Sequence, residues 1–172
     1  MRKKVAIIIL TLLMSHTIKA QEKDMLSMQV SFNQIEWGLQ RTLLNDKFWA
    51  ELYAGVGNQD MNSKFDDFTT GFGVGFIAFS TPKNQISMNS DIGIYCAKND
   101  AYSVTVPFVR AGVRYARFFG KTGKHGFLIR MGYQYGKRDY KQAYSSDNAL
   151  VSTIGTFKVA PLYFSIGYGF RF

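Results

Sequence analysis

The sequence predicts an all-β chain that closes into an antiparallel barrel of about eight strands with up-and-down topology. Three observations predict this fold. Side chains alternate between an apolar face and a face of glycine and polar groups, no segment after the N-terminus has a helical period, and polar links separate the alternating segments. The 172 residues provide one domain, and an apolar content of 47% argues against a disordered chain.

The N-terminus has the pattern of a secretory signal peptide. Arg2, Lys3 and Lys4 precede a largely apolar run at 5–14, which is shorter than the about 20 residues that a membrane-spanning helix needs. Ala20 is the expected last residue of the signal. We therefore expect residues 1–20 to be removed on export, and residues 21–172 to form the barrel domain.

The net charge of the chain belongs partly to this signal. Four of the 21 Lys and Arg residues lie in 1–20, so the formal net charge of +9 overstates that of the exported protein. A mild positive charge does not predict nucleic-acid binding, and we expect no nucleic-acid partner. The single cysteine, Cys96, excludes a disulfide within the chain and a zinc site built from several cysteines.

Eight segments are expected to be strands, because apolar residues recur in each at every second position. Within one of them, Phe72, Val74 and Phe76 alternate with glycines. The same alternation continues through most of the exported chain, which is typical of half-buried strands. The expected strands are 26–33, 36–44, 47–57, 67–80, 84–97, 103–118, 125–137 and 159–172.

The links between the expected strands have two lengths. A shift of the apolar phase between Val30 and Ile35 is interpreted as a tight turn near Asn33, with a bulge in one long strand as the alternative. Elsewhere short and long links alternate, which is typical of the inner turns and outer loops of a membrane barrel. Short links lie at 45–47, 81–83 and 120–124, and longer ones at 58–67, 98–103 and 137–156.

The two faces of the strands predict which side of the barrel is apolar. In a soluble barrel the apolar face would be covered, and the glycines would lie outside, where they weaken strands. In a transmembrane barrel the apolar face meets lipid, while glycines and charged residues fill a narrow lumen. The sequence therefore predicts a transmembrane barrel. The aromatic residues expected in its interfacial girdles are Phe48, Trp49, Phe79, Phe118, Phe119, Tyr163 and Phe172.

The last strand carries a specific pattern. Apolar or aromatic residues occupy every second position up to the final residue: Phe164, Ile166, Tyr168, Phe170 and Phe172. This strand resembles the C-terminal strand of Gram-negative outer-membrane β-barrels, and the chain is similar in architecture to the small barrels of the outer-membrane protein X and A type. The resemblance implies a monomer in the cell outer membrane, in contact with lipid and lipopolysaccharide, whose last strand is read by the barrel-assembly machinery.

An eight-stranded barrel has room for little more than its own side chains. Its inward faces are expected to set acidic residues against basic ones, with amides and Ser87 as bridges, because an unpaired charge in a narrow lumen is costly. We interpret this network as a plug; a narrow passage that attracts anions is the alternative. The expected members are Glu51, Asp91, Arg110, Arg114, Arg130, Asn89 and Gln134.

The predicted function is structural, or the display of an interaction surface on the outer loops. The link at 137–156 is the longest and most polar, and its binding candidates are Arg138, Tyr140, Lys141 and Tyr144. Their side chains suit lipopolysaccharide phosphates and an extracellular protein partner equally. Deletion of 140–147 is expected to leave folding intact.

The sequence favours no enzyme, catalytic residue, metal or cofactor. Some small outer-membrane barrels modify lipid A, but His125, the one histidine after the signal, has no serine within two residues, and a nucleophile needs a base in contact with it. One His and one Cys cannot form a tetrahedral metal site. The glycines at 71–75 precede no helical pattern, so a dinucleotide site is rejected. A soluble, lipocalin-like periplasmic barrel that binds an apolar ligand is a further alternative.

Overall fold

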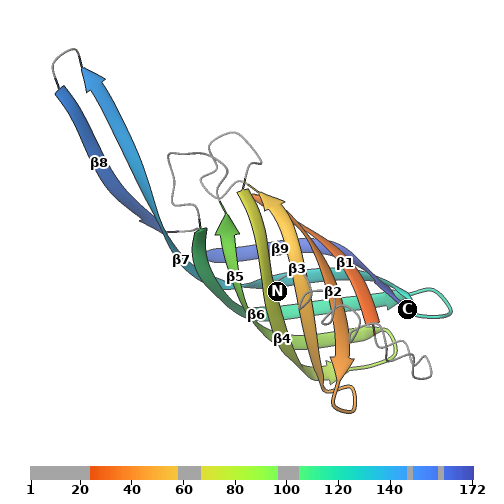
Figure 1. Cartoon of the computed structure of the whole chain (residues 1–172). Coiled ribbons are helices and arrows are strands. Elements are labelled where there is room, and N and C mark those ends of the chain that lie inside the picture. The colour runs from red at the N-terminus through yellow and green to blue at the C-terminus, as the bar shows by residue number, and fades with distance from the viewer. Residues whose placement is uncertain (1–23, 58–66, 97–104, 147–148, 159–160) are drawn as a thin grey trace, which may run out of the picture.

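The structure, a computed structural model, describes the backbone of residues 24–57, 67–96, 105–146, 149–158 and 161–172, and the side chains of these segments outside 138–160. Nine strands lie in these segments and form one sheet (Figure 1). They are β1 (Asp24–Ser31), β2 (Gln34–Leu43), β3 (Phe48–Gly57), β4 (Asp67–Ser80), β5 (Asn84–Cys96), β6 (Thr105–Phe119), β7 (His125–Ser146), β8 (Ala149–Lys158) and β9 (Leu162–Arg171). The described segments contain no helix with the length and hydropathy needed to cross a membrane.

Eight of the strands close into a barrel. Strands β1 to β7 pair consecutively and antiparallel, and β9 pairs with β7 on one side and with β1 on the other. Strand β8 pairs with the far half of β7, and with no other strand in the described part of the chain. The predicted closed, up-and-down, eight-stranded antiparallel barrel is therefore confirmed.

Tight turns close one end of the barrel, here called the turn end. The turn between β2 and β3 places Leu44, Asn45 and Asp46 at φ of 49°, 55° and 62°, and Asn and Asp tolerate such positive values better than other side chains. The β4–β5 and β6–β7 turns lie at the same end, as do both ends of the described chain, since the Phe172 amide donates to the Asp24 carbonyl over 3.0 Å. The three predicted short links are therefore turns of one end.

The opposite end, here called the loop end, begins with the turn between β1 and β2. Val30 and Ile35 are paired across this turn, so the shift of apolar phase marks a turn at residues 32–33, as interpreted from the sequence. The longer links predicted at 58–67 and 98–103 fall outside the described residues, apart from Asp67 at the start of β4. The predicted signal at 1–20 lies outside them as well.

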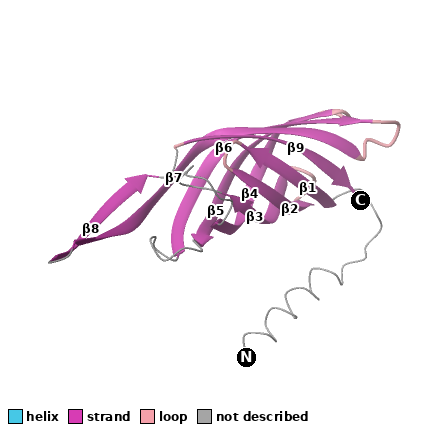
Figure 2. Ribbon diagram, turned by 90° about the horizontal axis from the view of Figure 1, so that it is seen from above, coloured by secondary structure: helices cyan, strands magenta, loops and turns pink. Residues whose placement is uncertain are grey.

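The prediction of a loop over 137–156 is wrong. The described residues of this segment belong to β7 and β8, which form a two-stranded ribbon that projects beyond the barrel (Figures 1 and 2). The physical reason is the register: Lys137 pairs with Lys158 and Tyr133 with Leu162, so the β7–β9 ladder continues without a shift into the ribbon. The side chains of the binding candidates Arg138, Tyr140, Lys141 and Tyr144 lie outside the described residues, although their backbone is part of β7.

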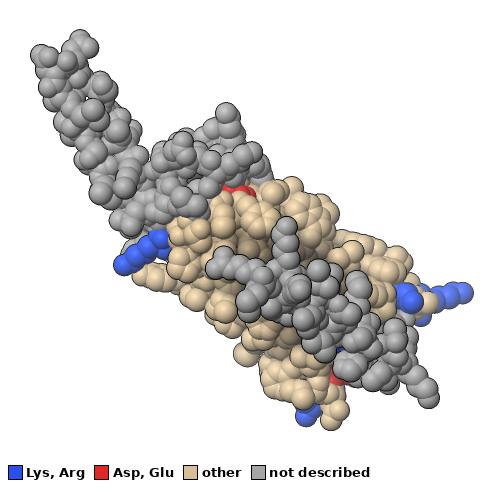
Figure 3. Space-filling view, viewed as in Figure 1, with Lys and Arg blue, Asp and Glu red and all other residues tan. Residues whose placement is uncertain are grey.

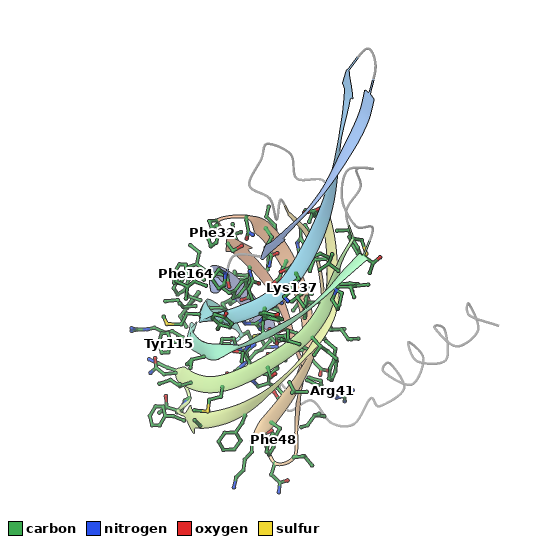
Figure 4. All side chains as sticks on the ribbon, turned by 90° about the vertical axis from the view of Figure 1, so that its left-hand side faces the viewer. Phe32, Arg41, Phe48, Tyr115, Lys137 and Phe164 are labelled. Carbon is green, nitrogen blue, oxygen red and sulfur yellow. The ribbon has the colours of Figure 1, made fainter. Side chains whose placement is uncertain are left out.

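The outside of the barrel is apolar. Large apolar side chains alternate along the strands and point away from the wall, as Phe48 and Phe164 do in Figure 4. On the face shown in Figure 3, Lys and Arg lie near the two ends of the barrel, and other residues cover the described part of its middle. The buried side chains are mostly polar, with Ser, Thr, Asn, Gln, Asp, Glu and Arg among them. This is the reverse of the distribution in a soluble protein.

The predicted aromatic girdles are correct for one face of the strands only. Phe48, Phe79, Phe119 and Phe172 are exposed on the outside, as expected. The prediction was wrong for the other three residues. Adjacent residues of a strand point to opposite faces, and each of these three is next to an outward residue. They point into the barrel and are at most 4% exposed: Trp49, Phe118 and Tyr163.

Candidate functional site

Three arginines and three carboxylates meet in the middle of the lumen. Each occupies an inward position of its strand, because every second residue faces the lumen. None is more than 3% exposed, so their charges must be compensated within the barrel. The six residues, here called the lumen network, are Glu36 on β2, Glu51 on β3, Asp91 on β5, Arg110 and Arg114 on β6, and Arg130 on β7.

Five members of the lumen network form a continuous chain of ion pairs. Arg110 Nη1 lies 2.8 Å from Glu36 Oε1, and its Nε lies 3.2 Å from Asp91 Oδ2. Arg130 continues the chain, with Nη1 at 3.4 Å from Asp91 Oδ2 and Nη2 at 2.5 Å from Glu51 Oε2. Asp91 is therefore shared by two arginines, and each arginine reaches a second carboxylate.

Two of the ion pairs cross the barrel from wall to wall. In the closed order of eight strands, β2 lies opposite β6, and β3 lies opposite β7. The Glu36–Arg110 pair joins the first two strands, and the Glu51–Arg130 pair joins the second two. The side chains of these two pairs therefore meet inside the barrel, between opposite walls.

Neutral groups donate further hydrogen bonds to the carboxylates. Gln34 Nε2 and Tyr163 Oη both donate to Glu36, each over 2.9 Å. Ser27 Oγ donates to Glu51 over 3.3 Å. The amide of Asn89 donates to Asp91 over 3.4 Å. The bound carboxylates thus have partners from several strands, which fixes their positions.

Arg114 is held differently from the other two arginines. Its Nη1 donates to the neutral Gln40 over 2.5 Å, again across the barrel from β6 to β2. Its guanidinium lies 4.0 Å from the ring centroid of Trp49. Arg110 also lies against rings, at 4.7 Å from the centroid of Tyr53 and 4.6 Å from that of Tyr163. Cation–π contacts of this kind are strongest where water is absent.

The glycines of β4 make room for these rings. A Cβ atom built at Gly75 would overlap the indole of Trp49, and one built at Gly71 would overlap the phenol of Tyr53. The hydroxyl of Tyr53 donates to the Ile92 carbonyl over 3.2 Å at the same place. The glycine face of the strand therefore lets aromatic rings lie close against the wall, and the rings in turn contact the arginines.

Apolar clusters lie above and below the lumen network. Near the loop end, Tyr53, Tyr95, Val106 and Phe108 form a cluster, and the Tyr95 hydroxyl donates to Gln134 over 3.1 Å. The cluster at the turn end is formed by Met25, Ala116, Phe118 and Leu128, with the Arg171 guanidinium 3.3 Å from the centroid of the Phe118 ring. Buried side chains thus lie in the lumen at three successive levels.

All seven residues predicted for the network point into the lumen. Four of them belong to the chain of ion pairs, while Arg114, Asn89 and Gln134 make the hydrogen bonds given above. The prediction missed Glu36 and Gln40, which share an inward face between the outward residues of β2. Their alternation with apolar neighbours was a signal that could have found them. It also missed the supporting rings, Trp49, Tyr53 and Tyr163.

Other chemically active side chains stand apart from the lumen. His125 lies exposed at the turn end, where its Nδ1 is hydrogen-bonded to the Tyr168 hydroxyl and its ring packs near Phe119 and Phe170. Cys96 is a free thiol. In the described segments, no three His, Cys, Asp or Glu residues come together as ligands for a metal ion.

Comparison with known proteins adds information on the fold. No family model and no curated relative matches the sequence. The structure is similar to the crystal structure of a major outer membrane protein from Thermus thermophilus, with a TM-score of 0.53 and 12% sequence identity. The similarity covers 87% of this chain and 98% of that chain. It supports the closed antiparallel barrel, while the narrower similarity to the X and A type barrels stays a prediction.

Proposed function

We propose that the chain is a small outer-membrane β-barrel, exported through the signal at 1–20, whose lumen is closed by the lumen network. Its role is structural, or it presents an outer surface to a partner. The distribution of side chains carries this proposal, because large apolar residues cover the outside and paired charges fill the inside. A bilayer stabilises that arrangement, whereas water makes so large an exposed apolar surface unfavourable.

The last strand supports the same location. Its outward residues, from Phe164 to Phe172, have the alternation of Gram-negative outer-membrane barrels, and the similar Thermus structure is of an outer membrane protein. Strand β9 also closes the barrel, since it pairs with both β1 and β7. The strand that the barrel-assembly machinery would read is therefore the one whose pairing completes the fold. We propose a monomer, as in the X and A type barrels.

The ribbon of β7 and β8 is the proposed outer surface. It extends the barrel at the loop end, which would face away from the cell. The backbone of Arg138, Tyr140, Lys141 and Tyr144 belongs to this ribbon. Basic and tyrosine side chains suit lipopolysaccharide phosphates or an extracellular protein partner, and both are part of this proposal.

Two other functions fit less well. A lipid A-modifying enzyme would need a nucleophile in contact with a base, and the described contacts of His125 are with Tyr168, Phe119 and Phe170. A lipocalin-like barrel would need an apolar lumen for its ligand. The middle of this lumen holds six charged side chains instead.

Conductance in planar bilayers tests whether the lumen is closed. The wild-type barrel is expected to give no stepwise current, because ion pairs cross the lumen between opposite walls. The double variant Arg110→Ala, Arg114→Ala is expected to conduct, since it removes two side chains that bridge β6 and β2. A matched control, Arg41→Ala, Arg117→Ala, removes two arginines of the outward face and is expected to stay silent.

Each preparation is first checked for a folded barrel by its heat-modifiable migration in gels. Steps of current through the folded wild-type protein would overturn the plug. A folded but silent double variant would show that these two arginines do not close the lumen.

A further inference from the structure

The outward face of the barrel carries few charges, and Arg117 stands out among them. It lies near the turn end of β6 and is exposed on the outward face. Its neighbours on that face are Tyr115 and Phe119 along the strand and Phe127 across the β6–β7 ladder. A guanidinium is thus surrounded by aromatic side chains at the edge of the apolar surface.

Arg117 differs from the other outward arginine at this end. Arg41 has a partner within the protein, because its Nε lies 3.6 Å from Asp24 Oδ1. No carboxylate of the described segments pairs with Arg117, and the sequence from 111 to 137 contains no Asp or Glu. A cation beside an apolar surface recruits an anion from its surroundings or extends toward the polar layer.

Two lysines lie beside this arginine on neighbouring turns. Lys83 ends the β4–β5 turn, and its carbonyl accepts a hydrogen bond from the Phe118 amide over 2.7 Å, next to Arg117. Lys121 belongs to the β6–β7 turn, which approaches the β4–β5 turn, since a Cβ at Gly123 would lie 3.8 Å from the Pro82 carbonyl oxygen. Both lysines are exposed.

We propose that Arg117, Lys83 and Lys121 bind the phosphate headgroup of an anionic phospholipid in the leaflet around the turn end. This inference rests on the proposed membrane location. The planar guanidinium of Arg117 suits a phosphate because it can donate two parallel N–H groups to two oxygens. Lys83 and Lys121 add positive charge from the turns just beyond the apolar surface.

The surroundings favour a lipid over a free anion. From Arg117 toward the middle of the barrel, the outward surface is formed by Val113 on β6 and its ladder partners Met88 and Met131, which can pack against an acyl chain. Tyr115 is fixed beside the cations, because its hydroxyl donates to Asn84 Oδ1 over 2.8 Å, and Asn84 pairs with Arg117 across the β5–β6 ladder. Cations next to an apolar surface are complementary to a phospholipid, because its phosphate group is joined to hydrocarbon chains.

Native mass spectrometry of the folded barrel tests this site. Phosphatidylglycerol and phosphatidylcholine with the same acyl chains are added to the detergent-solubilised protein, and the bound fraction of each is measured. Wild type is expected to prefer phosphatidylglycerol, and Arg117→Gln to lower its affinity for that lipid about fivefold, as expected for one basic residue near a membrane surface. Lys83→Gln and Lys121→Gln are expected to lower it as well.

Arg41→Gln is the matched control, because it removes an arginine from the same end whose partner is Asp24. It is expected to leave lipid binding unchanged. Equal binding of the two lipids by wild type, equal losses in Arg117→Gln and Arg41→Gln, or full competition by inorganic phosphate would overturn the lipid site. Stronger binding of lipid A than of phosphatidylglycerol would overturn the assignment to phospholipid.

Insertion into pure phosphatidylcholine vesicles is measured in parallel. A barrel that inserts there but shows no preference for phosphatidylglycerol contradicts this site alone. A protein that inserts into no vesicle contradicts the proposed function.

Discussion

Arg110 shows how one side chain in the lumen contacts residues from several strands. It contacts two carboxylates, Glu36 and Asp91, and lies against the rings of Tyr53 and Tyr163. Removing one member of a buried ion pair leaves the other charge without compensation, which costs more than the pair contributes when intact. The stability of the barrel should therefore depend on matched charges more than on their number.

Substitution at this pair tests that dependence. Arg110→Met is expected to lower the free energy of unfolding by about 3–5 kcal/mol, because Glu36 then stays buried without its arginine. The double variant Glu36→Gln, Arg110→Met is expected to regain most of the loss. Arg41→Met, at an ion pair that is about one-third exposed, should cost less than about 1 kcal/mol.

The measurement is urea unfolding of the barrel in lipid vesicles, followed by far-UV circular dichroism. An Arg110→Met barrel as stable as wild type would contradict the account of the network. So would a double variant that is less stable than Arg110→Met.

For a single residue, the sequence predicts whether the side chain points into the lumen or outward, but not which other side chain it contacts. Alternation along a strand places Glu51 and Arg130 in the lumen from local pattern alone. Their contact depends on the closure of the barrel, which brings β3 opposite β7, and 79 positions of sequence separate the two residues. The same limit explains why the supporting role of Trp49 was missed: a ring near a strand end suits a girdle as well as a lumen.

The ribbon of β7 and β8 is the element that extends beyond the barrel. Strand β7 has 22 residues, and the barrel uses its first part, since β9 pairs with His125 to Tyr133. Strand β8 pairs only with β7 among the described strands. Polar composition at 137–156 indicated a loop, but an unshifted register lets an existing ladder continue at little cost. Composition therefore predicted the secondary structure of this segment wrongly.

Shortening the ribbon tests its independence from the barrel. Asp139 pairs with Thr156, so replacement of residues 140–155 by Asn-Gly keeps the register and supplies a tight hairpin turn. The shortened protein is expected to fold into vesicles with an unchanged urea midpoint, because the barrel ladders are untouched. Deletion of 140–147 alone removes one side of the ribbon and serves as the comparison.

Heat-modifiable migration and the urea midpoint are measured for both deletions. Loss of insertion in the Asn-Gly variant would mean that the ribbon contributes to folding. It would then be more than a displayed surface.

The whole molecule reverses the usual arrangement of polar and apolar residues. Each strand alternates, eight strands fit the length, and the last strand has a characteristic pattern, so the closed barrel was predictable from the sequence. The contacts inside the lumen follow less directly, because they depend on which opposite side chains meet after closure. The proposed plug, lipid site and outer ribbon all depend on the orientation of the side chains, in which the apolar face of each strand meets hydrocarbon.

The two tryptophans report directly on that orientation. Trp37 lies in the middle of β2 on the outward face, where it is 46% exposed, whereas Trp49 faces the lumen and is 1% exposed. Single-tryptophan variants, Trp49→Phe and Trp37→Phe, are folded into vesicles whose lipids carry bromine on the acyl chains, and fluorescence quenching is measured. The account predicts that Trp37 loses most of its emission while Trp49 keeps it. Strong quenching of Trp49, with Trp37 unaffected, would contradict it.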